Sequence, residues 1–197
     1  MVLILSQNHL SAITAHAEQV YPEECCGLML GKIETQGAIT SKSVFDLAAL
    51  NNEWTPDALT ENMVNAGQSS YGEKPGEKPG EKPNSKHRRY HIDPKDMLRV
   101  QKQAREKGLS IIGVYHSHPD HVAEPSECDR ALAWPEYAYV IVAVHGPSRQ
   151  GLEGHGKENA IKAVDVQNWA LDSEHQFQPE AIKVSPSSAR DRMPVSA

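Results

Sequence analysis

Two histidines, His116 and His118, stand two positions apart directly after the apolar run SIIGVY. In an extended strand, residues i and i+2 face the same side, so the two imidazoles can converge on one point while Ser117 faces away. Imidazole is the commonest metal ligand among side chains. The pair can equally be a solvated polar turn that Pro119 ends, so by itself it is weak support for a metal site.

An acid eleven residues further along could complete such a site. A loop over residues 119–125 can bring Asp129 back to the histidines, and two histidines with one carboxylate leave a fourth position open, as in catalytic zinc sites. The acid also has a structural explanation, because Ser126 and Asp129 have the spacing of a helix capping box. Cys128 is a rival ligand, and we favour Asp129 over it. Zinc suits this set of donor atoms, although iron, cobalt or nickel could also bind it.

A catalytic metal of this kind also needs a general base to take a proton from water. Glu23 and Glu24 are candidates, because they directly precede the apolar run that starts at Cys25. From the residues alone these acids are simply two charges before a buried strand, so the choice between them stays open.

The chain resembles the JAMM family of metalloproteases, also called MPN-plus or Mov34/PAD-1, and its bacterial branch in particular. The family pattern has a glutamate shortly before a strand that contains glycine, leucine, two hydrophobic residues and glycine. H-x-H, seven further residues and S-x-x-D follow later in the chain. Here Glu24 precedes CCGLMLG, and HSH is followed by seven residues and SECD. Every spacing is met, and the match spans residues 1–170 apart from an insert.

The resemblance implies a role for each matching residue. His116, His118 and Asp129 correspond to the ligands of one zinc ion per chain. Glu24 stands three residues before the first glycine and corresponds to the general base, which decides between the two glutamates. Ser126 corresponds to the hydroxyl that stabilises the oxyanion of the tetrahedral intermediate.

The remaining cysteines and histidines receive no catalytic role from the resemblance. Cys25 and Cys26 fit as small structural residues of the strand. His91, His121 and His145 match no position of the family pattern. We therefore expect none of these five side chains to bind the metal.

By the same resemblance, we expect a zinc metallopeptidase or isopeptidase that hydrolyses the amide bond after the C-terminal Gly-Gly of a ubiquitin-like sulfur-carrier protein. Glycine would let the extended tail approach the metal closely. The alternatives are a zinc peptidase for unrelated peptides and a non-catalytic MPN scaffold, although such scaffolds have lost ligands or the glutamate. A zinc deaminase is disfavoured, because the pattern P-C-x-x-C does not occur in this sequence.

Composition narrows the class of protein further. The 197 residues suffice for one domain, and the net charge of −6 gives no support to nucleic-acid binding. Three cysteines, two of them adjacent, are no disulfide framework and fit a reducing cytoplasm. The start MVLILSQNHL has too short an apolar run for a signal peptide or a membrane span. Whether the protein forms a homodimer stays open.

Hydrophobic periodicity predicts the elements that position these residues. Ser6 and Asp93 are expected to cap helices, and Pro94 occupies the first helical position of the second one. The predicted order is that of an α/β or α+β sandwich, in which helices flank a mixed, largely antiparallel sheet, as in the JAMM and cytidine-deaminase architecture. We expect strands over 2–5, 25–34, 38–50, 89–92, 110–115, 137–144 and 161–170, and helices over 7–20, over 94–107 and from about 126.

Residues 51–87 differ in character from the rest of the chain, because residues 72–83 repeat GEKP three times. The repeat has no apolar side chain to bury, so we expect a disordered loop expansion, with a substrate-gating flap as the alternative. The insert as a whole could still border the active site. We predict a single catalytic domain over residues 1–184 and a disordered tail over residues 185–197.

Overall fold

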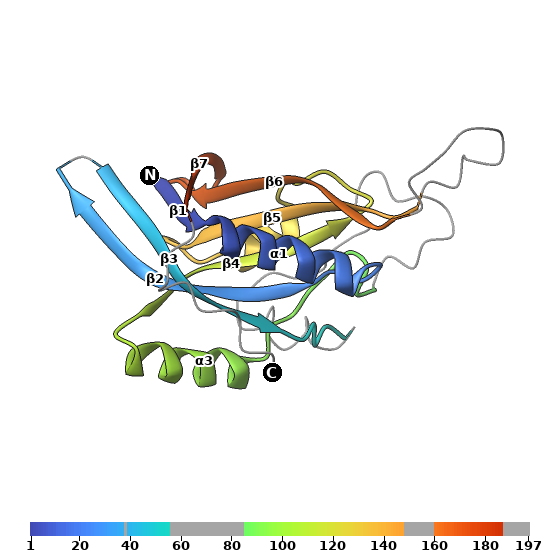
Figure 1. Ribbon diagram of the computed structural model, residues 1–197, viewed down its shortest axis with the longest axis horizontal. Coiled ribbons are helices and arrows are strands. Elements are labelled where there is room, and N and C mark those ends of the chain that lie inside the picture. The colour runs from blue at the N-terminus through green and yellow to red at the C-terminus, as the bar shows by residue number, and fades with distance from the viewer. Residues whose placement is uncertain (38, 56–84, 148–159, 187–197) are drawn as a thin grey trace.

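The computed structural model describes residues 1–37, 39–55, 85–147 and 160–186. Seven strands and three helices lie in these segments (Figure 1). Among them no helix is long and apolar enough to cross a membrane. The bounds are β1 Val2–Ser6, α1 Gln7–Val20, β2 Cys26–Gln36, β3 Ile39–Leu50, α3 Pro94–Glu106, β4 Ser110–Pro119, α4 Glu127–Leu132, β5 Ala138–His145, β6 Lys162–Leu171 and β7 Phe177–Ser185.

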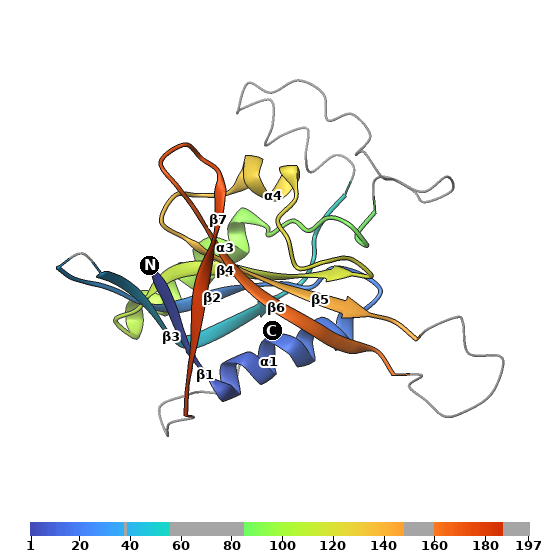
Figure 2. The same cartoon turned by 90° about the horizontal axis from the view of Figure 1, so that it is seen from above.

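The strands form one mixed sheet in the order β1-β3-β2-β4-β5-β6-β7, and β7 returns to pair with β1 (Figure 2). The pairs β1–β3, β1–β7 and β4–β5 are parallel, and the other neighbours are antiparallel. The mixed sheet with flanking helices is confirmed, but the sheet closes into a barrel where we expected a sandwich. The sequence does not predict the closing strand β7, because none of its residues is fully buried and the apolar signal is weak.

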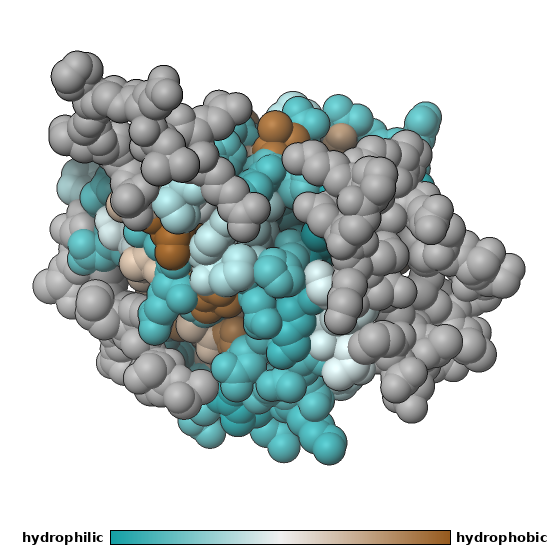
Figure 3. Space-filling view, turned by 90° about the vertical axis from the view of Figure 1, so that its right-hand side faces the viewer, coloured by the Kyte–Doolittle hydropathy of each residue, from teal (hydrophilic) through white to brown (hydrophobic). Residues whose placement is uncertain are grey.

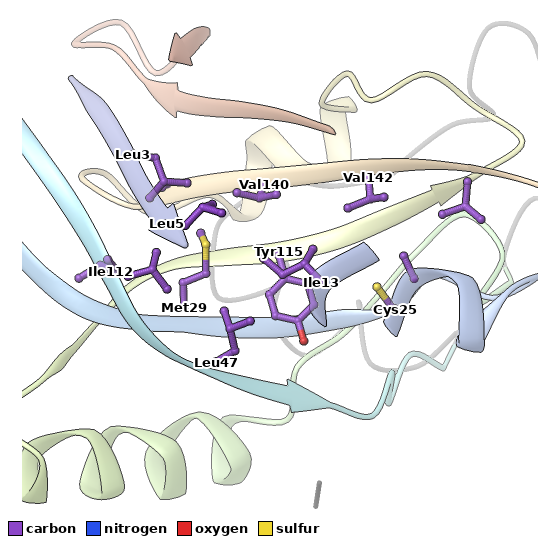
Figure 4. Close-up of a cluster of buried hydrophobic side chains, with 14 residues drawn as sticks. Leu3, Leu5, Ile13, Cys25, Met29, Leu47, Ile112, Tyr115, Val140 and Val142 are labelled. Atoms are coloured by element: carbon purple, nitrogen blue, oxygen red, sulfur yellow. The ribbon is translucent and has the colours of Figure 1, made fainter. Parts of the chain in front are cut away.

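Helices α1 and α3 cover opposite faces of the sheet (Figures 1 and 2). Successive residues of a strand point to opposite faces, and β2 shows this directly. Met29 packs in one cluster with Ile13 of α1, which Figure 4 shows in close-up. Leu28 packs in the other cluster with Val100 of α3. Each face of β2 therefore has its own buried core, and the alternate positions of β2 are not interchangeable.

Both predicted helix caps are present. The Ser6 hydroxyl accepts the backbone N–H of His9 at 3.2 Å, and the Asp93 carboxylate accepts the backbone N–H of Lys95 at 2.7 Å. Pro94 occupies the start of α3, where its missing N–H costs nothing. These local contacts satisfy N–H groups that have no partner within the helix, which is why the sequence located both starts correctly.

The segment 85–92 departs from the prediction. We expect a strand over 89–92, but this segment belongs to no strand of the described sheet. The side chain of Asn52 takes the place of a neighbouring strand: its amide donates to the carbonyl of Arg89 at 2.9 Å and accepts the N–H of His91 at 3.2 Å. The predicted strand over 89–92 is therefore wrong, because these residues bond to a side chain instead of to a neighbouring strand.

The ends of the predicted insert are also ordered. Asn52 and Trp54 are buried, and residues 85–88 form a turn. The GEKP repeat lies outside the described residues, as does most of the predicted tail. Ser185, the first residue of that tail, is the last residue of β7.

Two glycines of β2 permit close approach to both neighbouring strands. A Cβ on Gly31 would lie 2.0 Å from the backbone oxygen of Ser43 in β3, and a Cβ on Gly27 would lie 2.3 Å from the ring of Tyr115 in β4. No side chain other than hydrogen fits at such distances. These glycines therefore help to fix how closely β2 lies between β3 and β4.

We predict that Gly31→Ala lowers the free energy of unfolding by about 1–3 kcal/mol, because the clash is with backbone that cannot rotate away. Urea denaturation measures this change. Gly37→Asn is the control, since Gly37 has φ 62° and open space around it, a conformation that asparagine tolerates. Equal losses in the two variants would refute the close-approach explanation.

Candidate active site

The antiparallel ladder between β2 and β4 brings the predicted site residues to one end of the sheet. Cys26 pairs with His116 in this ladder. Two positions further along, the same register places Glu24 opposite His118. Paired residues of a ladder face the same side, so the Glu24 carboxylate and both imidazoles belong to one face of the sheet, the face that α3 covers.

Ser117 reinforces this register between the two histidines. It is fully buried, its Oγ accepts the backbone N–H of Cys25 at 2.8 Å, and its own N–H donates to the Cys25 carbonyl at 3.2 Å. The residue next to Glu24 is therefore joined by two hydrogen bonds to the residue between the histidines. The distance between the glutamate and the histidines is set by backbone contacts.

The three predicted ligands converge. His116 Nε2 lies 3.1 Å from His118 Nε2, and the two carboxylate oxygens of Asp129 lie 3.4 Å from His116 Nε2 and 3.8 Å from His118 Nε2. One ligand atom from each side chain falls within 4.8 Å of the others, and all three side chains are buried. Two nitrogens and a carboxylate oxygen in this arrangement fit a divalent cation such as zinc with a fourth position open.

The Asp129 side chain caps helix α4 and faces the two histidines at the same time, so the helix cap and the predicted ligand role are compatible. Its Oδ2 accepts the backbone N–H of Ser126 at 2.6 Å, while Ser126 Oγ accepts the N–H of Asp129 at 3.2 Å. The capping box of α4 thus holds the carboxylate toward the histidines. Cys128, the rival ligand, instead accepts a hydrogen bond from Arg89 Nη1 at 3.3 Å and lies outside the group.

Contacts behind the histidines orient their rings. His118 Nδ1 lies 2.9 Å from the carbonyl oxygen of Val122. A carbonyl only accepts, so Nδ1 carries the proton and Nε2 is left to face the site. The His116 ring stacks on Tyr90, with ring centroids 4.5 Å apart and an interplanar angle of 27°.

The flanks of the insert hold Glu24 in place, a feature that sequence reasoning missed. The Glu24 backbone N–H donates to the carbonyl of Lys86 at 2.7 Å, and the Asn52 amide donates to the Glu24 carbonyl at 3.0 Å. The side chain of Glu24 is buried. No short motif points to Asn52 or Tyr90, because their partners lie far away along the chain.

Two hollows meet at the site. The larger, of about 560 Å³, lies between segment 88–92, α3 and α4 and reaches Ser126 and Asp129. The smaller, of about 210 Å³, is lined by Glu24, His118 and Ser126. Figure 3 shows the end of the molecule where β4 ends; its described surface is mostly hydrophilic, with a few hydrophobic side chains between.

Within the described part of the chain, His91, His121, His145 and the buried cysteines are not members of the ligand group. His91 lines the larger hollow, His121 the smaller one, and His145 is exposed at the end of β5. Burial raises the pKa of the Cys25 thiol to about 12 and raises that of Cys26 as well. Both thiols therefore stay protonated at neutral pH, and neither is suited to act as a nucleophile.

The pKa shifts of His118 and Asp129 show that the cluster favours a positive charge among its side chains. Burial lowers the pKa of His118, but the hydrogen bond to Asp129 and the negative charges of Glu24 and Asp129 outweigh it and raise the pKa to about 9. Burial raises the pKa of Asp129, but the charges of His116 and His118 and hydrogen bonds to His118 and Ser126 outweigh it and lower the pKa well below its ordinary value. A metal cation bound between these groups would balance the negative charge of the carboxylates in place of the His118 proton.

We predict that zinc binding releases a proton at neutral pH. With a pKa raised to about 9, His118 is protonated at pH 7, and the metal must displace that proton. The apparent zinc affinity should therefore rise with pH by up to about tenfold per unit below that pKa and level off above it. Chelator competition measures the affinity, and calorimetry in two buffers counts the protons. His145→Gln should behave as the native protein, and a pH-independent affinity would contradict the prediction.

We predict that Ser117→Ala destabilises the protein by about 1–3 kcal/mol, because the buried N–H of Cys25 loses its side-chain acceptor. The free energy of unfolding measures this loss. Zinc stoichiometry should stay at that of the native protein, since no ligand changes. Ser41→Ala, at a partly exposed hydroxyl of β3, is the matched control and should lose under about 0.5 kcal/mol. A stability loss no larger than that of the control would contradict the proposed role of Ser117.

Comparison with known families and relatives gives a consistent picture. The sequence matches the family of prokaryotic homologues of the JAB domain over residues 6–154. A solved structure of the protein DSY2949 from Desulfitobacterium hafniense superposes with a TM-score of 0.60 at 21% identity, covering 95% of both chains. At that identity the likeness supports the fold alone.

Three named relatives match parts of the chain. The desampylase of Haloferax volcanii is 36% identical over 58 residues, which are 29% of this chain and 42% of that protein. The CysO-cysteine peptidase of Mycobacterium tuberculosis is 23% identical over 155 residues, 78% of this chain and 82% of that protein. The probable TtuB-protein conjugate cleaving protease of Thermus thermophilus is 38% identical over 72 residues, 36% of this chain and 48% of that protein. The chain thus spans less than half of two of these relatives.

Proposed function

Since the chain belongs to the family of prokaryotic homologues of the JAB domain, we propose that it is a zinc-dependent peptidase of the JAMM type. Its substrate would be the amide bond after the C-terminal Gly-Gly of a ubiquitin-like sulfur-carrier protein. The observation that carries the proposal is one buried face on which three ligand atoms lie within 4.8 Å and Glu24 shares a hollow with His118 and Ser126. The alternative of a non-catalytic scaffold is disfavoured, because such scaffolds have lost ligands or the glutamate and all of these residues are present here.

The proposed chemistry divides among the residues of this face. A zinc ion held by His116, His118 and Asp129 would supply Lewis acidity, which polarises the scissile carbonyl and makes water a stronger acid. Glu24 takes a proton from the attacking water and transfers it to the leaving amine. The Ser126 hydroxyl, whose oxygen already accepts one hydrogen bond, donates its proton toward the developing oxyanion.

The proposed hydrolysis consumes one water molecule. The amide C–N bond breaks, the water oxygen stays on the glycine carboxylate, and the amine leaves with the proton that Glu24 transfers.

The three cysteines form no disulfide, and we place the protein in a reducing cytoplasm. The carrier protein is the partner we propose, and neither nucleic acid nor membrane is part of the proposed reaction.

The test offers the zinc-loaded protein a ubiquitin-like sulfur carrier extended by one or more residues after Gly-Gly. We expect release of the extension, detected by mass spectrometry and abolished by a chelator. Glu24→Gln should slow it by about 10²–10⁴-fold with zinc content unchanged, because the proton transfer loses its base. Glu23→Gln, one residue away, is the matched control and should keep its activity. No cleavage by the native enzyme, or equal cleavage by Glu24→Gln, would refute the proposal.

A further inference from the structure

The smaller hollow is the side of the site on which the leaving group must lie. Glu24 delivers a proton to the leaving amine, so that nitrogen must lie near the Glu24 carboxylate. Glu24 lines the smaller hollow and does not line the larger one. Ser126 lines both hollows, which places the scissile carbonyl at their boundary. The acyl part of the substrate then occupies the larger hollow, and the residue after the scissile bond occupies the smaller.

Arg88 stands at this boundary as well. It lines both hollows and also a third, of about 370 Å³, beside Pro22, Pro119 and Asp120. Among the described residues that line the smaller hollow, Arg88 is the one arginine or lysine. Its side chain is half-buried, so part of its charge is shielded from water. One cationic residue, Arg88, therefore lines the leaving-group side of the site, beside the acids Glu24 and Glu124.

The backbone on both sides of Arg88 is tied to Glu24. Two residues before it, the Lys86 carbonyl accepts the Glu24 N–H at 2.7 Å. One residue after it, the Arg89 carbonyl accepts the Asn52 amide at 2.9 Å, and the same amide donates to the Glu24 carbonyl at 3.0 Å. The Arg88 N–H closes the turn onto the Ser85 carbonyl at 3.1 Å. Short hydrogen bonds thus tie the backbone around Arg88 to the backbone of the proposed general base.

A guanidinium in this position suits a carboxylate ligand. Its planar fork donates two parallel hydrogen bonds to a carboxylate, and such charge-assisted bonds are stronger than neutral ones. When one residue follows the scissile bond, its α-carboxylate lies within a residue's length of the leaving nitrogen. Each further residue moves the carboxylate roughly 3.5 Å outward. An isopeptide bond to a lysine side chain places no carboxylate there at all.

We propose that Arg88 binds the free α-carboxylate of a single residue attached to the carrier's terminal glycine, so that the enzyme releases one amino acid in preference to cleaving protein conjugates. This inference rests on the proposed peptidase function. Arg88 acts here as a specificity-determining residue that touches the substrate. Glu24, Ser126 and the metal ligands act only on the scissile amide and are common to both kinds of substrate.

The experiment compares a matched pair of substrates. The carrier is extended after Gly-Gly by the single residue that the zinc-loaded enzyme releases fastest, once as the free acid and once as the C-terminal amide. We expect kcat/KM to be about 10- to 100-fold higher for the acid, the range for a hydrogen bond between charged groups. Arg88→Gln should remove that preference by slowing the acid while leaving the amide unchanged. Lys95→Gln removes an exposed cation of α3 outside the hollows and should keep the preference.

The outcomes separate this inference from the function on which it rests. If the native enzyme cleaves neither substrate, the peptidase function fails. If it cleaves acid and amide equally, or if Arg88→Gln slows both to the same degree, the function stands and the role of Arg88 is refuted. The amide substrate and the zinc content of each variant report on folding, so a misfolded variant cannot imitate the loss of preference.

Discussion

The antiparallel register of β2 on β4 is the constraint on which the rest of the site depends. With Cys26 opposite His116, Glu24 reaches the position opposite His118 and shares its face. A slip by one residue would turn the glutamate toward the face that α1 covers and leave the metal site without its proposed base. The close approach at Gly27 and the two hydrogen bonds between Ser117 and Cys25 oppose such a slip.

The same register gathers groups that are costly to bury together. Two imidazole nitrogens lie 3.1 Å apart beside a buried carboxylate. Burial removes the hydrogen bonds that these groups make to water in the unfolded chain, and the contacts among the three side chains replace only part of them. In the metal-free protein a proton on His118 balances the carboxylates. A divalent cation balances them more fully, so its binding free energy also stabilises the fold. The site is therefore better matched to the metal-bound protein than to the free one.

How much the sequence could predict depends on how local each contact is. The alternation of HSH, the Ser126–Asp129 cap and the starts of both long helices depend on residues within four positions of one another, and all appear in the structure. Barrel closure depends on β1 pairing with β7 across almost the whole chain, so no local pattern reveals it. The hydrogen bonds of Asn52 to residues 89 and 91 also join positions far apart in the sequence, so no local pattern reveals them. The choice of Glu24 over its neighbour needed either the family pattern or the β2–β4 register.

Substrate choice depends on a different part of the chain from catalysis. In the proposed function the metal ligands, Glu24 and Ser126 act on the scissile amide, so they do not distinguish a leaving amino acid from a leaving protein. Discrimination must come from groups beyond the leaving nitrogen, and the described wall there is formed by the 119–125 loop and the turn at 85–88. That turn is held to the Glu24 backbone, so a changed side chain on it alters the hollow without moving the base. The same arrangement of metal ligands and glutamate can therefore be combined with different side chains on this turn, and with them different substrates.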